Sequence, residues 1–583
     1  MIVYRKAEST ATTRGCMSRL LALLRRFDEG AFCHGDAVEA LIEWGEFASG
    51  VMDAVCPQED TRNDMTRALD EAGVIAGHIL RSSWEKVERG GDGDGPMKWA
   101  SMLRDAIQGL FRFDLPGDIT LREPEGFAHY GLYPETYLEA ARRFFAENRP
   151  KRAACIGLRS IGVSLSSVVA AVLEDRGCAV SPFTLRPREH PFNRRVILSS
   201  GLASELPVTR ADYYLIVDEG PGLSGTSLSS VADCLSSLGI PDERIVIFPS
   251  WEPDGANFFS ESARRRWQRH RKYTGSFGDI WVKSGRLADL AGVSAPIDVS
   301  AGFWRGRFFE DSSDYPAVDP YHEKRKYLFD DGSGGERLLR FAGLGRYGRI
   351  KLSRAGRLSG AGFVQKVHGL KNGFLDVGFE QGRPVTKGSI RPELLDRMGE
   401  YLAFIRNNLP ARKDMAFDEL YGMAERNTLL GLGQEWAGRL SPLRGFRKIV
   451  EDSPPSEVDG RMLPHEWIDT GHGYIKADGF DHYSDQFFPC AQDIAWDVAG
   501  AFVEFGLDGS SSARLMGRYI SLTGDKDVAA RLPFYSLAYL AYRLGYCTFA
   551  EREMRATPDG PRFKALLEGY GLMLKSEILK LSA

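Results

Sequence analysis

Residues from about 15 to 112 carry hydrophobic side chains at helical spacing. The stretch from Ala37 to Val51 places most of its large apolar side chains on one stripe. These side chains are Val38, Leu41, Ile42, Trp44 and Phe47. Glycine and aspartate crowd residues 90 to 95, which indicates a loop. We therefore predict a helical N-terminal region over residues 1–119, serving as a cap on the next domain or as a surface for a partner.

The pattern changes near residue 120 to short apolar runs that alternate with helical periodicity. Ala153 to Leu158, Tyr213 to Val217 and Ile245 to Phe248 are typical of buried strands. The intervening helical segments end at Gly177 and Gly239. Strand–helix–strand order with short links predicts an α/β domain with a parallel sheet and right-handed crossovers, over residues 120–305. In such a sheet, ligands bind at the carboxyl ends of the strands.

A polar zone rich in Asp, Ser and Pro from about residue 310 to 321 predicts a domain linker. Beyond it, Lys326 to Gly348 is typical of a strand, a turn, a second strand and a glycine-rich bend. The chain from about residue 390 is mainly helical, with one loop-rich passage from Asp452 to Gln492. We predict an α+β domain with two lobes over residues 320–583.

Composition and charge narrow the class of protein. A chain of 583 residues predicts two or three domains, and 43% apolar with 26% charged residues is ordinary for a soluble globular protein. The net charge of -4 gives no global sign of nucleic-acid binding. The local arginine cluster from Arg264 to Arg271 could bind a phosphate-rich ligand, and a solvated helix or loop face is the interpretation that we favour.

Cysteines and apolar runs bear on where the protein works. The eight cysteines form no Cys-x-x-Cys pair, which favours reduced thiols in a cytoplasmic protein. No apolar run has the length of a membrane span, and no apolar core follows Arg5 and Lys6 as it would in a secretory signal. We expect no membrane partner and leave homo-oligomerisation open.

The segment from Tyr214 to Ser227 contains the strongest chemical signal. It reads as a buried strand that ends in Asp218 and Glu219, a turn rich in glycine and hydroxyl groups, and the start of a helix. Backbone N–H groups of such a turn and the positive end of the helix dipole form a site for a phosphate monoester. The two carboxylates could accept hydrogen bonds from vicinal sugar hydroxyls or hold Mg²⁺ through water.

This segment resembles the phosphoribosyl-pyrophosphate motif of the type I phosphoribosyltransferases. The resemblance implies displacement of pyrophosphate at the ribose anomeric carbon by an unidentified acceptor, with Asp218 and Glu219 as the catalytic and metal-binding pair. It also implies a set of residues that contact phosphoribosyl pyrophosphate: Arg159, Ser160, Gly162, Arg186, Gly222, Leu223, Ser224, Gly225, Thr226 and Ser227. The chain departs from the motif in having Ser224 where the family usually has Thr, and in a longer loop that contains Pro221.

The second half contains two acidic elements, Tyr474 to Phe480 and Gln492 to Gly500. Together they resemble the aminoglycoside phosphotransferase and choline-kinase branch of the protein-kinase-like fold. The resemblance implies that ATP binds there, that Asp478 binds Mg²⁺, and that Asp493 and Asp497 support the catalytic loop. A helix cap is the alternative role for Asp493.

At the other positions of the kinase motifs, this chain has different residues from those of the family. The third-strand lysine that touches the nucleotide phosphates corresponds best to Arg340, whose planar fork binds phosphate in a different geometry. The catalytic loop fits best from Asp459 onward. Arg461 then replaces the catalytic Asp, and Glu466 replaces the metal-binding Asn. This half is therefore either a small-molecule kinase or a degenerate kinase domain.

Two functions follow from these sites. The first is a cytoplasmic fusion enzyme, a phosphoribosyltransferase joined to a kinase or degenerate kinase domain. The second is a non-catalytic sensor or regulator that binds phosphoribosyl pyrophosphate or nucleotides. The sequence does not identify the acceptor or the direction of transfer.

Overall fold

A computed structural model describes residues 1–5, 7–89, 95–190, 192–222, 224–256, 258, 260–292, 296–412, 415–480 and 482–581. The chain divides into two compact units. Ala7–Leu290 with Gly343–Tyr347 form one, here called the parallel-sheet unit. Met1–Lys6, Ala291–Ala342 and Gly348–Ala583 form the other, here called the cavity unit.

The parallel-sheet unit is built around five parallel strands in the order β4-β3-β5-β6-β7. These strands are β3 (Arg152–Leu158), β4 (Ala179–Leu185), β5 (Tyr213–Val217), β6 (Ile245–Phe248) and β7 (Arg271–Lys272). The three strands expected from the sequence are β3, β5 and β6. A separate two-stranded sheet pairs β1 (Glu8–Thr12) with β2 (Asp118–Arg122).

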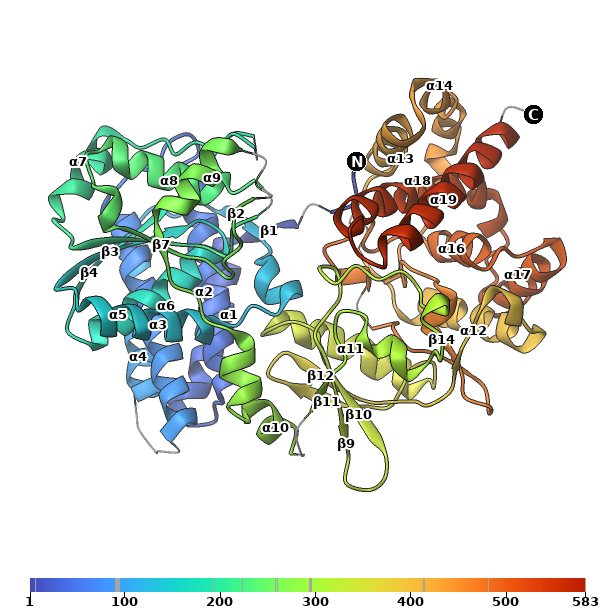
Figure 1. The fold of residues 1–583 in the computed structure, drawn as a ribbon, viewed down its shortest axis with the longest axis horizontal. Helices are drawn as coiled ribbons and strands as arrows, with labels where there is room; N and C mark the ends of the chain where they lie inside the picture. The colour runs from blue at the N-terminus through green and yellow to red at the C-terminus, as the bar shows by residue number, and fades with distance from the viewer. Residues whose placement is uncertain are drawn as a thin grey trace. The chain divides into compact units, whose positions relative to one another are not determined.

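Helices cover both faces of this sheet (Figure 1). The helices of the unit are α1 (Thr13–Asp28), α2 (His34–Val55), α3 (Asp64–Arg89), α4 (Gly95–Gly109), α5 (Pro134–Asn148), α6 (Ile161–Asp175), α7 (Ser200–Val208), α8 (Thr226–Ser237), α9 (Glu261–Arg269) and α10 (Arg286–Ala291). Alternate strand residues such as Ile156, Tyr214 and Ile247 point to the face covered by α7, α8 and α9. Helices α5 and α6 lie on the opposite face.

The expected separate N-terminal region is part of this unit. Helices α2 and α3 pack directly on α6, so they form a third layer on the sheet. Helix α2 is buried almost all round, including Glu39, Glu43 and Glu46, where the sequence predicted one apolar stripe. The reason is that α2 is enclosed by neighbouring helices and β2, and two of its glutamates pair with Arg346.

The cavity unit begins with a five-stranded antiparallel sheet in the order β11-β12-β10-β9-β8. The strands are β8 (Ile297–Asp298), β9 (Lys326–Asp330), β10 (Glu336–Phe341), β11 (Val367–Lys371) and β12 (Phe374–Gly378). The hairpin of β9 and β10 is the strand–turn–strand that the sequence predicts. A small second sheet contains β13 (Arg383–Pro384), β14 (Trp467–Asp469) and β15 (Tyr474–Lys476).

The rest of the cavity unit is mainly helical and holds its own hydrophobic core. Its helices are α11 (Arg346–Gly360), α12 (Pro392–Asn408), α13 (Phe417–Leu432), α14 (Gln434–Gly438), α15 (Arg447–Glu451), α16 (Ala495–Phe505), α17 (Gly509–Thr523), α18 (Val528–Met554) and α19 (Gly560–Lys580). The expected linker at residues 310–321 belongs to this unit, because side chains of that segment line its cavity. The domain boundaries predicted at 119/120 and 305/320 therefore differ from the two units observed.

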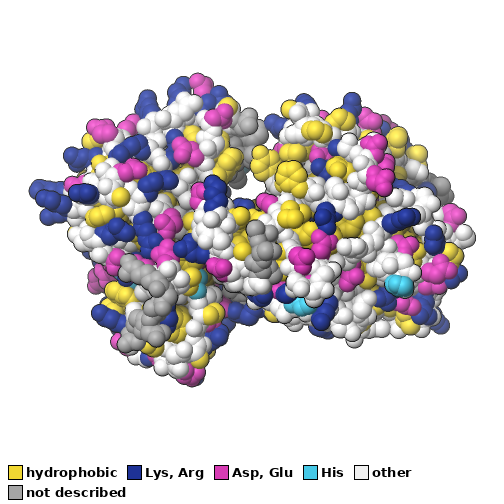
Figure 2. All heavy atoms as spheres, turned by 60° about the horizontal axis from the view of Figure 1, so that its bottom comes forward, with side chains coloured by type: hydrophobic (Ala, Val, Ile, Leu, Met, Phe, Trp, Pro, Cys, Tyr) yellow, Lys and Arg dark blue, Asp and Glu magenta, His cyan; other side chains and the backbone are white. Residues whose placement is uncertain are grey.

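The charges on the surface and the character of the helices bear on nucleic-acid binding and on membrane crossing. On the face shown in Figure 2, basic and acidic side chains are interspersed, which is unlike a phosphate-binding surface of a nucleic-acid-binding protein. Among the described residues, no helix combines the length and the apolar character that a membrane crossing requires.

Candidate functional site

The order of the parallel strands locates the first candidate site. Strand β3 lies between β4 and β5. The chain passes from β3 to β4 on one side and then returns to β5 on the other side, so the direction of the connections reverses at β3. Such a switch point opens a crevice at the carboxyl ends of the two central strands. The turn from Leu158 to Gly162 follows β3, and Asp218 and Glu219 follow β5. The structure thus brings together two segments that are far apart in the sequence.

Glycine allows these two segments to touch. A Cβ atom on Gly162 would lie 2.7 Å from the Val217 carbonyl oxygen and 3.2 Å from Asp218 Oδ1. The neighbouring Ser160 has a φ of 139°, a conformation that L-residues rarely adopt. Strained backbone of this kind is often found at functional sites.

The turn after the acidic pair leads directly into α8. Gly225 has a φ of 64°, and its N–H donates to the Gly222 carbonyl oxygen at 3.0 Å. The hydroxyls of Ser224 and Thr226 lie 3.0 Å apart at the start of the helix, and Ser227 follows in its first turn. Leu223 lies outside the described residues. The turn therefore places hydroxyls and a helix N-terminus together, as expected for an anion site.

The two carboxylates are partly buried and carry raised pKa values. Burial raises the pKa of Asp218 to about 6, against the lowering effect of the Arg186 charge. Burial, together with the charges of Glu125 and Asp218, raises the pKa of Glu219 to about 8. The Gly126 N–H donates to Glu219 at 3.2 Å. Carboxylate oxygens are the ligands that Mg²⁺ prefers, so the donor types of this pair fit the implied metal ion.

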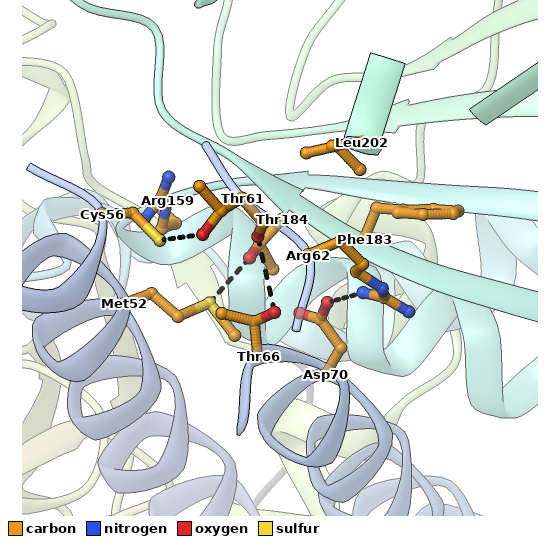
Figure 3. A pocket seen from close by; sticks show the side chains of 10 residues that line it. All are labelled: Met52, Cys56, Thr61, Arg62, Thr66, Asp70, Arg159, Phe183, Thr184 and Leu202. Carbon is orange, nitrogen blue, oxygen red and sulfur yellow. Dashed lines mark hydrogen bonds and ion pairs between the residues drawn. The ribbon is translucent and has the colours of Figure 1, made fainter. Parts of the chain in front are cut away.

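Arg159 lies among residues of the N-terminal helical region. This side chain is buried and turns toward the N-terminal helices, where it pairs with Asp60 and lies 3.4 Å from Asp53. Burial lowers the pKa of Arg159 to about 10. Figure 3 shows Arg159 beside a cavity of about 10 Å³ lined by residues such as Thr61, Asp70 and Thr184. That space holds one water molecule at most, so it is too small for a phosphate group.

Arg186 belongs to a cluster of arginines around two aspartates. Its Nε donates to Asp53 at 3.0 Å, and its backbone N–H donates to Asp60 at 2.8 Å. Arg188 donates to Asp60 at 2.7 Å, and Arg122 lies 3.4 Å from Asp53. With Arg159 this makes four arginines, which face Asp53, Asp60 and the Glu8 partner of Arg122, so the cluster retains one positive charge. Because Arg186 also lowers the pKa of Asp218, that positive charge lies near the acidic pair.

Sequence reasoning missed Asp53 and Asp60. Both come from the helical N-terminal region, to which we assigned no chemistry, and Asp60 is 126 residues from Arg186. Neither lies in a recognisable motif, so only the packing of α2 and α3 against the sheet could reveal them.

The second candidate site surrounds β14 and β15 in the cavity unit. Asp478 pairs with Arg340, and His482 Nε2 lies 3.5 Å from the other Asp478 oxygen. Glu466 accepts a hydrogen bond from Lys476 at 2.6 Å, and Lys476 also donates to Asp459 at 3.2 Å. The carboxylates proposed as metal ligands are therefore held by cationic side chains of the chain itself.

Lys476 is the residue that the sequence did not single out. It is fully buried. Burial alone would lower the pKa of Lys476, but the charges of Asp459 and Glu466 outweigh it and raise that pKa. The ammonium group therefore stays charged between the two carboxylates, in the place where a metal ion would bind. The residues of this site do not fit the Mg²⁺ ion that the kinase resemblance implies.

Asp497 and Asp493 support the surrounding loop. Asp497 accepts the backbone N–H groups of Asp459 and Gly460 at 2.6 and 2.8 Å. Asp493 accepts the Ala495 N–H at 3.0 Å, which caps the start of α16, and pairs with Arg531. Arg461 is half-buried and is held charged by Glu466 and Asp485.

A cavity of about 640 Å³ adjoins this site within the cavity unit. Arg340, Glu466 and Asp478 line it together with Arg461, His465 and the segment that contains Trp304 to His322. The His465 ring stacks on Trp304 at 5.9 Å. Burial lowers the pKa of His465 to about 4, so its ring is neutral at pH 7. The cavity has the size and mixed lining of a small-molecule site.

Comparisons with known proteins gave matches among solved structures. No protein-family model matches the chain. No curated protein matches it either. The choline/ethanolamine kinase family protein from Mesorhizobium loti is 17% identical, with 43% of this chain and 84% of that chain covered and a TM-score of 0.34. The choline kinase from Streptococcus pneumoniae is 14% identical, with 42% and 89% covered and a TM-score of 0.30.

A spectinomycin phosphotransferase in complex with ADP and spectinomycin is 11% identical, with 47% of this chain and 92% of that chain covered and a TM-score of 0.31. Scores this low do not establish a shared fold. The interpretation of both units therefore rests on the motifs and contacts of the chain itself.

Proposed function

We propose that the parallel-sheet unit is a phosphoribosyltransferase domain that binds phosphoribosyl pyrophosphate with Mg²⁺ and transfers its ribosyl phosphate to a small-molecule acceptor. The observation that carries this proposal is the meeting of three groups at one switch point. They are the Asp218–Glu219 pair, the turn at the start of α8, and the positive cluster that contains Arg186. Each matches a different part of the substrate.

In this proposal each group has one task. Asp218 and Glu219 accept hydrogen bonds from the ribose hydroxyls, and the amides and hydroxyls of Gly222 to Ser227 bind the 5′-phosphate. Arg186 would contribute positive charge to the binding of the diphosphate. A Mg²⁺ ion held by the acidic pair would neutralise charge on the diphosphate as it leaves.

The proposed reaction exchanges one bond at the anomeric carbon. The bond to the diphosphate oxygen breaks, and the diphosphate leaves with the electron pair. A bond to the acceptor nucleophile forms, and the acceptor loses its proton to solvent or base. Positioning and electrostatic stabilisation supply most of the rate enhancement in such a step.

The test is the double variant Asp218→Asn with Glu219→Gln. It keeps the size of both side chains but removes their ability to ionise, so we expect the affinity for phosphoribosyl pyrophosphate to fall by roughly 100-fold or more. Isothermal titration with Mg²⁺ and this ligand measures the affinity. The matched control is Asp242→Asn with Glu243→Gln, another adjacent Asp–Glu pair, in the 3₁₀ turn Asp242–Arg244. Equal affinity in the test variant and the wild type would remove the site assignment.

A sensor or regulator is the second candidate for the same unit. The positive arginine cluster and the raised pKa of Glu219 are compatible with ligand binding alone. Pyrophosphate release across a panel of nitrogen, oxygen and carbon acceptors distinguishes the two. Binding without release for any acceptor favours the sensor.

For the cavity unit we propose binding of a nucleotide or another phosphorylated small molecule without phosphoryl transfer. Arg461 replaces the expected catalytic Asp, and Lys476 fills the gap between Asp459 and Glu466. Arg340, Arg461 and His465 would contact the ligand in the cavity. No phosphoryl-transfer step follows from these residues, because Asp459, Glu466 and Asp478 are each paired with Lys476 or Arg340 and so do not serve as a free base or fit Mg²⁺.

This proposal predicts metal-independent binding. ATP should bind with the same affinity in chelator and in Mg²⁺, and Arg340→Met should weaken it. Arg514→Met, at an exposed ion pair with Asp396, is the control for loss of one arginine. Hydrolysis of ATP that requires Mg²⁺ and disappears in Asp478→Ala would contradict the proposal.

A further inference from the structure

A second group of potential metal ligands lies in the cavity unit, away from β14 and β15. Asp319, His322 and Glu553 each offer one ligand atom, and these three atoms lie within 4.8 Å of one another. Asp319 and His322 belong to the segment between β8 and β9, and Glu553 lies at the end of α18. The Asp319 and His322 side chains are 0% and 8% exposed, so these two are shielded from solvent, and Glu553 is half-buried.

Two atoms in the group are oriented toward each other without a hydrogen bond. Asp319 Oδ1 accepts the Tyr321 N–H at 3.0 Å, which leaves Oδ2 to face His322 Nδ1 at 3.1 Å. Among the described residues, neither Asp319 Oδ2 nor His322 Nδ1 has a hydrogen-bond partner. Buried polar atoms normally make a hydrogen bond, whereas these two make only their ion-pair contact with each other, so both keep the capacity to bind a ligand.

The spacing suits a metal ion as that partner. Two ligands bound at about 2.1 Å in tetrahedral or octahedral geometry lie roughly 3.0 to 3.4 Å apart, which includes the observed separation. Glu553 brings a second carboxylate next to Asp319. Because two neighbouring carboxylates repel each other, a cation between them would relieve that repulsion.

The surroundings hold the histidine ring in the orientation that a metal site needs. Tyr4 Oη lies 2.9 Å from His322 Nε2, so the second ring nitrogen has a partner and Nδ1 points to the carboxylates. The ring also packs edge-on against Phe487 at 4.8 Å and near Tyr546 at 5.5 Å. Metal-binding histidines are usually held by such a contact at the nitrogen that does not bind the metal.

We propose that Asp319, His322 and Glu553 bind one divalent transition-metal ion, Zn²⁺ or Mn²⁺, at the wall of the 640 Å³ cavity. One nitrogen and two oxygen donors favour these ions over Ca²⁺ and Mg²⁺, which prefer oxygen alone. Three protein ligands leave at least one coordination position for water or a ligand. Because Asp319 and His322 line the cavity, that position faces it.

The other candidate group in the same unit gives a built-in comparison. Asp459, Glu466 and His482 also lie within metal-ligand distance of one another. There the Lys476 ammonium already bonds to both carboxylates, so the charge is balanced without an ion. The two groups have the same three residue types and differ in that internal cation. We therefore expect metal binding at His322 and none at His482.

The test uses the full chain after removal of metal by a chelator. Titration with Zn²⁺ and with Mn²⁺ should show one site per chain, and Co²⁺ should give an absorption band that reports the histidine ligand. His322→Gln and Asp319→Asn should each weaken binding by roughly 100-fold or more. His482→Gln is the matched control for loss of a buried histidine, and His472→Gln for loss of an exposed one.

A folding defect is separated from loss of a ligand by thermal melting. The metal-free His322→Gln variant should melt close to the metal-free wild type, and Zn²⁺ should raise the melting temperature of the wild type alone. Zero stoichiometry in the wild type, or wild-type affinity in both His322→Gln and Asp319→Asn, would overturn the proposal. Loss of binding in His482→Gln would also overturn it, because it would move the site to the second group.

Discussion

At the scale of single residues, the first candidate site depends on glycines that permit close approach. Gly225 combines a φ of 64° with a tight contact, since a Cβ atom there would lie 2.5 Å from the Phe258 ring. Gly239, at the other end of α8, has a similar φ of 82° but open space around it. Substitution at Gly239 therefore tests backbone strain alone, and substitution at Gly225 tests strain together with crowding.

We predict that Gly239→Ala costs about 1 kcal/mol of stability, from the left-handed backbone alone. Gly225→Ala should cost about 2 to 4 kcal/mol, because crowding against Phe258 adds to that strain. It should also weaken phosphoribosyl pyrophosphate binding, since the turn must shift. Chemical denaturation and ligand titration measure the two effects. Equal costs at both positions would show that Phe258 yields without penalty.

His465 gives a residue-scale prediction about pH. Its folded-state pKa of about 4 lies below the value of about 6.5 in an unfolded chain, so the unfolded chain takes up a proton first as the pH falls. The stability that depends on a neutral His465 is complete above about pH 6.5 and is lost as the pH falls toward about 4. His465→Gln should therefore lose less stability than the wild type between about pH 7 and about pH 5. Denaturation curves at the two pH values test this, and parallel losses would contradict it.

At the scale of elements, the small sheet of β14 and β15 decides the chemistry of the second site. Its register places Trp467 opposite Lys476, which sends the lysine inward beside Glu466. A single-residue shift of that register would point Lys476 away. The position of the Lys476 ammonium between the two carboxylates thus depends on the strand pairing as well as on the presence of a lysine.

Lys476→Met should destabilise the cavity unit by about 3 to 5 kcal/mol, because it leaves Asp459 and Glu466 buried without their cation. Adding Glu466→Gln should recover part of that loss, because only one uncompensated carboxylate remains. Denaturant titration of the two variants measures the difference. A loss below about 1 kcal/mol for Lys476→Met would show that solvent or another cation reaches the carboxylates.

The same elements show how far sequence patterns reach. Apolar runs predicted β3, β5 and β6 because strands buried on both faces are continuous in sequence. The turn at Gly225 was also predictable from local sequence, because glycine is the residue that most readily adopts a positive φ. The pairings of Arg159 with Asp60 and of Lys476 with Glu466 were not, because they join side chains whose meeting depends on how helices and strands pack. The net charge of a site depends on which side chains the tertiary fold brings together, and local sequence patterns do not predict that.

At the scale of the whole molecule, two hydrophobic clusters of the described residues share no members. One lies in each unit, so each unit has the means to unfold by itself. The proposed ligands are divided in the same way. Phosphoribosyl pyrophosphate would bind in the parallel-sheet unit, and the transition metal would bind in the cavity unit.

This division predicts two calorimetric transitions with separate ligand responses. A ligand at 100 times its dissociation constant stabilises the unit that binds it by about 2.7 kcal/mol, which corresponds to a shift of several degrees for a unit of this size. Phosphoribosyl pyrophosphate with Mg²⁺ should raise one transition, and the double variant Asp218→Asn with Glu219→Gln should remove that shift alone. Zn²⁺ should raise the other, and His322→Gln should remove only that one. A single transition raised by both ligands would mean that the two cores unfold as one cooperative structure, and the functional sites would then be coupled through it.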